Sequence, residues 1–129
     1  MALRLEPFTA FGDLPFSLTA EALVARLGPP NRCARNNVAL NEYDYGHSVL
    51  RFQDGGRLEE ITLRAPVLLL DTVAIPFAAL ASFVLEQDAG TFERAGFLVS
   101  PAFGLAFVPD EPDWVTALAR HCIPTWRAL

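Results

Sequence analysis

Residues 15–30, PFSLTAEALVARLGPP, can form one short amphipathic helix and nothing longer. Ser17 is placed to cap the N-terminus, with Thr19 as the alternative, because a hydroxyl oxygen accepts from the free amides of a first turn. Gly28 tolerates a left-handed C-cap, and the prolines at 29 and 30 cannot continue a helix. The apolar side chains recur at a spacing of three and four: Leu18, Ala22, Leu23, Ala25 and Leu27. The chain must therefore turn back after residue 28 and give this helix a surface to pack on.

The residues that follow change to the alternating pattern of β-strands. After a polar loop, residues 38–46 and 47–53 alternate apolar and polar side chains. Residues 54–56, Asp-Gly-Gly, are typical of a hairpin turn because they accept positive φ. Residues 57–64, RLEEITLR, then alternate again. We expect one helix followed by three antiparallel strands in the first half of the chain.

The second half shows the same order of patterns. Residues 67–70 form a buried apolar run, and Pro76 suits the first position of a helix that stops at residues 87–90. Alternating segments follow at 95–101, 104–110 and 114–120. The last of these also matches a helix capped by Asp113, but its alternation favours a strand.

The two halves can be laid over each other so that Pro15 falls on Pro76 and Leu50 falls on Leu105. This match predicts an internal repeat at about 15–64 and 74–120. The predicted fold class is α+β, with two tandem helix-plus-three-strand antiparallel units, (αβββ)2, in one compact domain over residues 1–129. We expect the tail at 123–129, IPTWRAL, to be an extended segment that covers a sheet edge.

The composition narrows the class of protein. With 52% hydrophobic and 19% charged residues, the 129-residue chain has the make-up of a globular domain. The net charge of −5, with arginine as the only strongly basic residue type, argues against nucleic acid as a partner. The longest apolar run is interrupted by Pro66, Asp71 and Pro76, which argues against a membrane span, and no signal peptide is evident. We therefore expect a cytoplasmic protein.

The phrase SLTAEALVARLGPPN followed by strands resembles the αββ modules typified by the outer-membrane assembly lipoprotein BamE. The tandem arrangement is similar to the β-lactamase inhibitory protein, whose aromatic-rich concave sheet binds its target. The chain departs from both, because the lipid-attachment cysteine of the first and the disulfides of the second are not evident. It also resembles small bacterial cytosolic proteins of unassigned role, some of them thought to be immunity partners of toxins. These resemblances imply a non-catalytic protein-binding module, an immunity-type inhibitor of a bacterial toxin.

Residues that carry chemistry are present but do not form a recognisable catalytic set. His47 lies near Asp44, but in a strand the two side chains point to opposite faces. Cys122 follows His121, and no third residue stands at a spacing that completes a nucleophile, base and orienting group. The chain is therefore predicted not to be an enzyme.

Metal and cofactor sites are not predicted either. The acids Glu42, Asp44, Glu59 and Glu60 are interpreted as a solvated sheet face. The two histidines and two cysteines are scattered along the chain, so we expect no zinc site and no cofactor. A reduced state is expected for Cys33 and Cys122, with a disulfide between them left open.

Aromatic residues with a polar group, flanked by acids, are the best candidates for binding, because such residues often anchor interfaces. The predicted set is Glu42, Tyr43, Asp44, Tyr45, Trp114 and Trp126. The acidic charge predicts a basic protein partner. Two alternatives are a small-ligand or enzyme domain whose pocket lies between helix and sheet and uses His47, and a structural homodimer.

Overall fold

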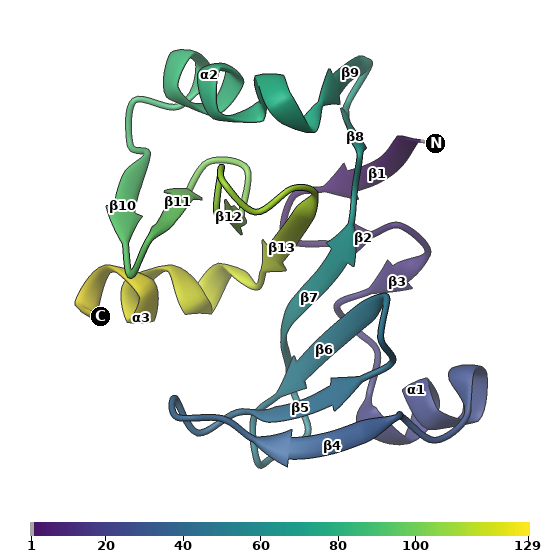
Figure 1. Ribbon diagram of the computed structural model, residues 1–129. Coiled ribbons are helices and arrows are strands. Elements are labelled where there is room, and N and C mark those ends of the chain that lie inside the picture. Colours follow the sequence, from purple (N-terminus) through teal and green to yellow (C-terminus); the bar gives the residue numbers. More distant parts are fainter. Residues whose placement is uncertain (1) are drawn as a thin grey trace.

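The structure is a computed structural model that describes residues 2–129, and these residues form two β-sheets with few helices (Figure 1). The smaller sheet has the order β3 (Leu14–Pro15), β2 (Ala10–Phe11), β1 (Ala2–Glu6), β8 (Val67–Leu70), β9 (Val73–Pro76). The larger sheet has the order β10 (Phe92–Arg94), β11 (Phe97–Ser100), β12 (Leu105–Phe107), β13 (Trp114–Leu118), β7 (Leu58–Arg64), β6 (Ser48–Phe52), β5 (Asn41–Asp44), β4 (Arg32–Arg35). The helical segments are α1 (Ala20–Leu27), α2 (Phe77–Gln87), the 3₁₀ turn η1 (Arg120–Cys122) and α3 (Ile123–Ala128).

The predicted α+β class with two helix-plus-three-strand units is wrong, because the fold is mostly β. Strands β4 and β10 form in segments predicted to be loops, and each pairs along its length with the next strand of the larger sheet. Residues 2–15 and 67–76 supply a second sheet of their own, in which β1 pairs in parallel with β8. Short polar strands such as β4 carry little propensity signal, since pairing with a neighbour satisfies their backbone groups whatever their side chains are.

The larger sheet consists of two four-stranded antiparallel meanders, β4–β7 and β10–β13. They join where β7 pairs with β13, in a register that sets Val115 opposite Leu63 and Ala117 opposite Ile61. The strand predicted at 114–120 is confirmed over 114–118, and η1 begins at Arg120. Strand β13 pairs with β12 on one edge and with β7 on the other, and its side chains alternate between the two faces of the larger sheet.

Helix α1 begins after the alternative cap and not after Ser17, and it ends at the predicted glycine. Thr19, the alternative cap, accepts a hydrogen bond from the amide of Ala22 at 3.1 Å. The helix ends at Gly28, whose φ is +82°. The hydroxyl of Tyr45 donates to the carbonyl oxygen of Gly28 at 2.9 Å, so a strand-end side chain satisfies the end of the helix.

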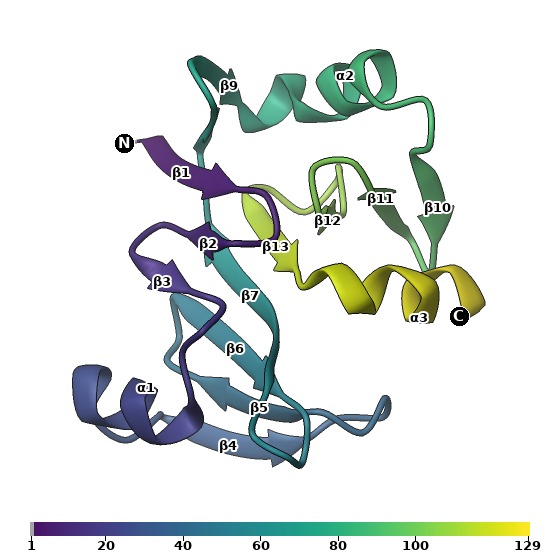
Figure 2. The ribbon, with the colours of Figure 1, turned by 180° about the vertical axis from the view of Figure 1, so that it is seen from behind.

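One side of the larger sheet, which we call the inner face, carries Leu50, Ile61, Leu63, Val115 and Ala117. It packs against the smaller sheet, α1 and α2 in the main hydrophobic core (Figure 2). The helices contribute buried side chains to this core: Leu23 from α1, and Phe77, Leu80 and Val84 from α2. Each such side chain stabilises the fold by roughly 1.5–3 kcal/mol.

The other side of the larger sheet, the outer face, carries Val49, Arg51, Thr62, Trp114 and Thr116. Helix α3 covers only the part of this face over β10–β13, in a second core of Val99, Ala106, Leu118, Ala119, Cys122 and Trp126. Figure 1 shows α2 and α3 on opposite sides of these strands. The rest of the outer face has no helix over it within the part of the chain that the structure describes.

The predicted extended tail is wrong, because residues 123–128 form helix α3. Pro124 lies in the first turn, where a proline needs no hydrogen-bonded amide. The indole of Trp126 then packs edge-on against Phe97, with ring centroids 5.1 Å apart. Among residues 2–129, no helix is long and apolar enough to cross a membrane.

The turn that follows β1 contacts the turn that precedes β12. Phe8, in the turn after β1, lies against Gly104, in the turn before β12, and the guanidinium of Arg120 stacks on its ring at 3.9 Å. Gly104 has a φ of +64°, and a Cβ there would lie 2.7 Å from Cε1 of Phe8. An alanine is therefore both strained and overpacked at this position.

Gly104→Ala is expected to lower the free energy of unfolding by about 2–3 kcal/mol, from left-handed strain and overpacking together. The matched control is Gly96→Ala, in the turn between β10 and β11, where φ is +86° but no atom lies within 4 Å of the added Cβ. The control is expected to lose about 1 kcal/mol, the conformational cost alone. Urea denaturation of the three proteins measures both values. Equal losses in the two variants would contradict a role for the Phe8 contact.

Candidate functional site

The uncovered part of the outer face holds a cavity of about 250 Å³. Strands β6, β7 and β13 form its floor, and the loop after β12 forms one wall. The lining residues are Val49, Arg51, Thr62, Phe97, Val108, Glu111, Trp114 and Thr116. Aromatic and aliphatic groups thus surround one cation, two hydroxyls and one carboxylate.

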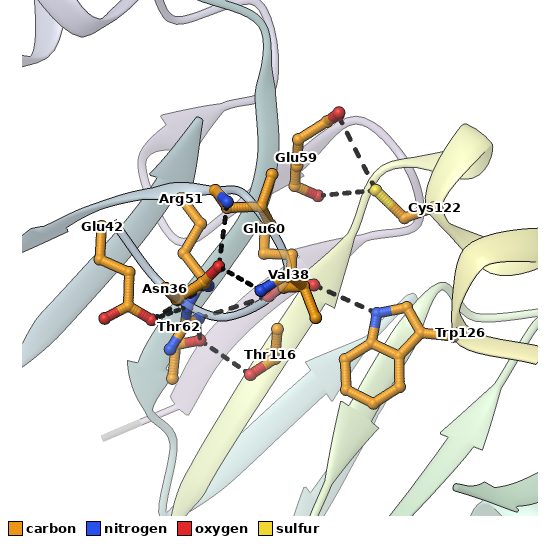
Figure 3. A network of polar contacts seen from close by, with 11 residues as sticks. Asn36, Val38, Glu42, Arg51, Glu59, Glu60, Thr62, Thr116, Cys122 and Trp126 are labelled. Atoms are coloured by element: carbon orange, nitrogen blue, oxygen red, sulfur yellow. Dashed lines mark hydrogen bonds and ion pairs between the residues drawn. The ribbon is translucent and has the colours of Figure 1, made fainter. Parts of the chain in front are cut away.

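Arg51 is held in place by hydrogen bonds across three strands (Figure 3). Its Nε donates to Oε2 of Glu42 at 2.8 Å, and its Nη1 donates to Oγ1 of Thr62 at 2.8 Å and lies 3.4 Å from Oε1 of Glu60. The hydroxyls of Thr62 and Thr116 are 2.8 Å apart, which extends the network onto β13. A cation with two carboxylate partners presents little net positive charge to the cavity.

The pKa values of Glu60 and Glu42 are shifted in opposite directions in this network. Burial raises the pKa of Glu60 above its ordinary value, although the charge of Arg51 acts in the opposite direction. Partial burial also opposes ionisation of Glu42, but the hydrogen bond and charge of Arg51 hold its pKa below the ordinary value. Glu60 also accepts a hydrogen bond from Nε1 of Trp126 at 3.1 Å. The network therefore links the sheet to α3.

The structure separates the residues predicted to form a binding surface. Glu42 and Asp44 lie on the outer face of β5, opposite Arg51 and Val49 of β6. Tyr43, between them, faces inward, and its ring packs edge-on against Phe52 with centroids 5.2 Å apart. This division follows from strand alternation, which sends neighbouring side chains to opposite faces. Tyr45 also packs against the inner core, and its hydroxyl donates to the carbonyl oxygen of Gly28 at the C-terminus of α1.

The two tryptophans share the outer face but differ in exposure. Trp114 is half-buried at the cavity, and the guanidinium of Arg64 lies 5.1 Å from its ring centroid. Trp126 is buried beneath α3. Sequence reasoning missed Arg51 and Phe97 as neighbours of Trp114. For Arg51, the available signal was that it and the oppositely charged Glu42 each occupy a polar position of an alternating segment. For Phe97, no local pattern gave a signal.

A second polar cluster, Glu59–His121–Cys122, lies where β7 meets η1. A β-bulge between Arg51 and Phe52 shifts the register, so Glu59 leaves the alternation of β7. Its Oε2 contacts Nε2 of His121 and lies 3.8 Å from Sγ of Cys122. The sequence interpretation of Glu59 and Glu60 as part of a solvated sheet face is wrong, because both are buried. The histidines and cysteines were expected to be scattered, and Glu59 meets His121 although 62 residues separate them.

The chemistry of this cluster does not favour a nucleophile. Burial, followed by the charges of Glu59 and Glu60, raises the pKa of Cys122 to about 12. The thiol is therefore protonated at neutral pH, and a protonated thiol is a poor nucleophile. The other cysteine, Cys33, is exposed, and both are free, so the disulfide left open by the sequence is not formed.

His47 does not form the pair with Asp44 that a general base would need. The carboxylate of Asp44 accepts from the amide of Gly46 at 2.7 Å, and no hydrogen bond joins the His47 imidazole to any residue of 2–129. His47 is exposed at the rim of a second cavity of about 290 Å³, between the last turn of α1 and strands β6 and β7.

No protein family, no curated protein and no solved structure matches the chain. The resemblances to BamE-like modules and to the β-lactamase inhibitory protein therefore stay hypotheses.

Proposed function

We propose that the chain is a non-catalytic protein-binding module and that the uncovered outer face binds a basic segment of a protein partner. The observation that carries this proposal is the half-buried Trp114 beside a cavity whose cation, Arg51, is already neutralised. An immunity-type inhibitor of a toxin is one form of this function, and the sequence resemblance favours it.

The aromatic groups are suited to anchor a partner. Trp114 and Phe97 line the same cavity, and neither is fully buried. Large rings that keep part of their surface exposed gain most from burial against a second protein, and tryptophan is enriched among residues that dominate binding energy. Arg64, stacked on Trp114 and paired with Asp113 at 2.6 Å, holds the indole in one orientation.

Charge selects the kind of partner. The chain carries a net charge of −5, and the exposed Glu111 stands at the cavity wall, with Asp44 farther along the same face. An arginine or lysine of a partner can lay its aliphatic stem along the apolar lining and place its charge near these carboxylates. Such complementarity speeds encounter and selects against acidic partners.

A peptide selection tests the proposal. A displayed random peptide library is selected on the native chain, and the recovered peptides are measured by isothermal titration calorimetry. We expect basic, aromatic-containing peptides whose Kd rises at least about 30-fold for Trp114→Ala, the loss typical of an interface hot spot.

The control variant is Leu85→Ala, which removes an exposed apolar side chain from α2, on the opposite side of the sheet. Its Kd is expected to stay within about twofold of the native value, since surface changes away from a site have small effects. Thermal unfolding of each variant confirms that it is folded. Peptides that bind Trp114→Ala as tightly as the native chain would refute the proposed surface, and recovery of acidic peptides would refute the charge argument.

A further inference from the structure

We propose that Glu59, His121 and Cys122 form a Zn²⁺ site with three protein ligands and a fourth position open to solvent. This site is separate from the proposed binding surface, and neither proposal depends on the other. It rests on three features of the cluster: the donor atoms, their spacing and their surroundings.

The donor atoms are those that zinc selects. A thiolate sulfur, an imidazole nitrogen and a carboxylate oxygen are the three protein ligand types of this ion, and sites with three protein ligands leave a position for water. The soft sulfur excludes Mg²⁺ and Ca²⁺, which take oxygen ligands. The cluster therefore matches zinc in ligand type and in number.

The spacing is already close to that of a metal site. The three donor atoms lie within 4.8 Å of one another, and the Sγ of Cys122 is 3.8 Å from Oε2 of Glu59. In a tetrahedral zinc site, sulfur and oxygen ligands are separated by about 3.6 Å, given metal–ligand bonds of about 2.3 and 2.1 Å. The sulfur–oxygen separation in the cluster is thus already close to that of a bound ion.

The surroundings of the cluster hold two of its ligands in place and leave the third accessible to solvent. Glu59 and Cys122 are buried, whereas His121 is exposed and leaves a path for the ion from solvent. The guanidinium of Arg57 lies 3.3 Å from Oε1 of Glu59 and orients the carboxylate. A bound ion would replace the present contact between Oε2 of Glu59 and Nε2 of His121. The carboxylates that disfavour a thiolate here would favour a dication.

The site has a structural consequence, because its ligands come from two distant parts of the chain. Glu59 lies on β7, and His121 and Cys122 lie in η1, directly before α3. A bound Zn²⁺ would fasten α3 to the sheet, and its binding would release the proton of the Cys122 thiol. At free Zn²⁺ about 100-fold above Kd, we expect the Tm of the chain to rise by about 10 °C.

The test uses the full chain without an affinity tag, stripped of metal by a chelator. Calorimetric titration with ZnCl₂ is expected to show one site per chain. Titration with Co²⁺ is expected to produce the near-ultraviolet thiolate-to-cobalt charge-transfer band and the visible bands of a tetrahedral ion. Cys122→Ser is expected to abolish the charge-transfer band, and His121→Ala to weaken Zn²⁺ binding more than about 100-fold, since loss of an outer-shell partner alone costs 10–100-fold.

The chain supplies matched controls, because it has one further cysteine and one further histidine. Cys33→Ser and His47→Ala are expected to leave both titrations unchanged, as both residues are exposed and lie outside the cluster. His121 is exposed, so His121→Ala tests the site without disturbing the core, and metal-free thermal unfolding verifies the fold of each variant. The proposal is overturned if the native chain binds no Zn²⁺ at micromolar concentration, or if Cys122→Ser and His121→Ala bind it as the native chain does.

Discussion

Trp126→Ala is expected to lower the free energy of unfolding by about 3–5 kcal/mol, the usual loss when a buried tryptophan is truncated. The indole is 9% exposed, packs against Phe97 and joins α3 to the outer face. The change opens a cavity beneath α3 and leaves the buried Glu60 without the hydrogen bond from the indole. Urea denaturation followed by circular dichroism measures the loss.

Trp126→Phe separates packing from hydrogen bonding. Phenylalanine keeps an aromatic ring against Phe97 but cannot donate to Glu60. Its expected loss is about 1.5–3 kcal/mol, the range for a hydrogen bond to a charged group. If Trp126→Ala unfolds at the same urea concentration as the native chain, α3 is not held by this side chain.

Arg51→Met is expected to lower the free energy of unfolding by about 3–5 kcal/mol at neutral pH, because it removes one partner of a largely buried ion pair. Arg51 and Glu60 have side chains that are 21% and 11% exposed, and Glu42 shares the same cation. Methionine retains much of the aliphatic stem, so the loss reports mainly on charge. The double variant Arg51→Met/Glu60→Gln is expected to recover much of it, since a neutral amide needs no cation. Equal losses in the single and double variants would contradict this account.

The penalty of Arg51→Met should also depend on pH. Glu60 has a raised folded-state pKa, so its contribution to stability is complete below the unfolded value near 4.5 and is lost as pH rises through the folded value. Without Arg51 the folded pKa rises further, which enlarges this loss at neutral pH. Glu42 has a lowered pKa, and the stability that Arg51 gives it fades as pH falls through that value. Both effects make the difference between native and Arg51→Met chains shrink as pH falls from 7 toward 4.

Local patterns predicted several elements correctly. The glycine at 28 and the hydroxyl at 19 mark the ends of α1 because backbone geometry and free amides are local properties. Alternation located β6 and β7, and it explains why Tyr43 faces away from Glu42 and Asp44. Strands β4 and β10 were missed because their formation depends on a neighbouring strand.

In the candidate site, too, local patterns predicted some features, whereas others depend on contacts between distant segments. Trp114 was predicted to be a binding residue from its residue type and from a strand pattern, and the structure confirms the strand. The cavity beside it also requires the pairing of β7 with β13, which no spacing in the sequence indicates. The Glu59–His121–Cys122 cluster depends on a β-bulge and on the docking of η1, so separation along the chain gave a false impression of scatter.

The sequence by itself determined where helices α1 and α2 end, and which side chains of a strand share a face, because steric limits on φ and ψ and the two-residue period act within a few residues. The tertiary structure alone decided which strands pair, which face α3 covers and which polar groups meet. Those outcomes depend on the burial of apolar surface and on the pairing of backbone groups between segments far apart in the chain, and neither is encoded in any single segment.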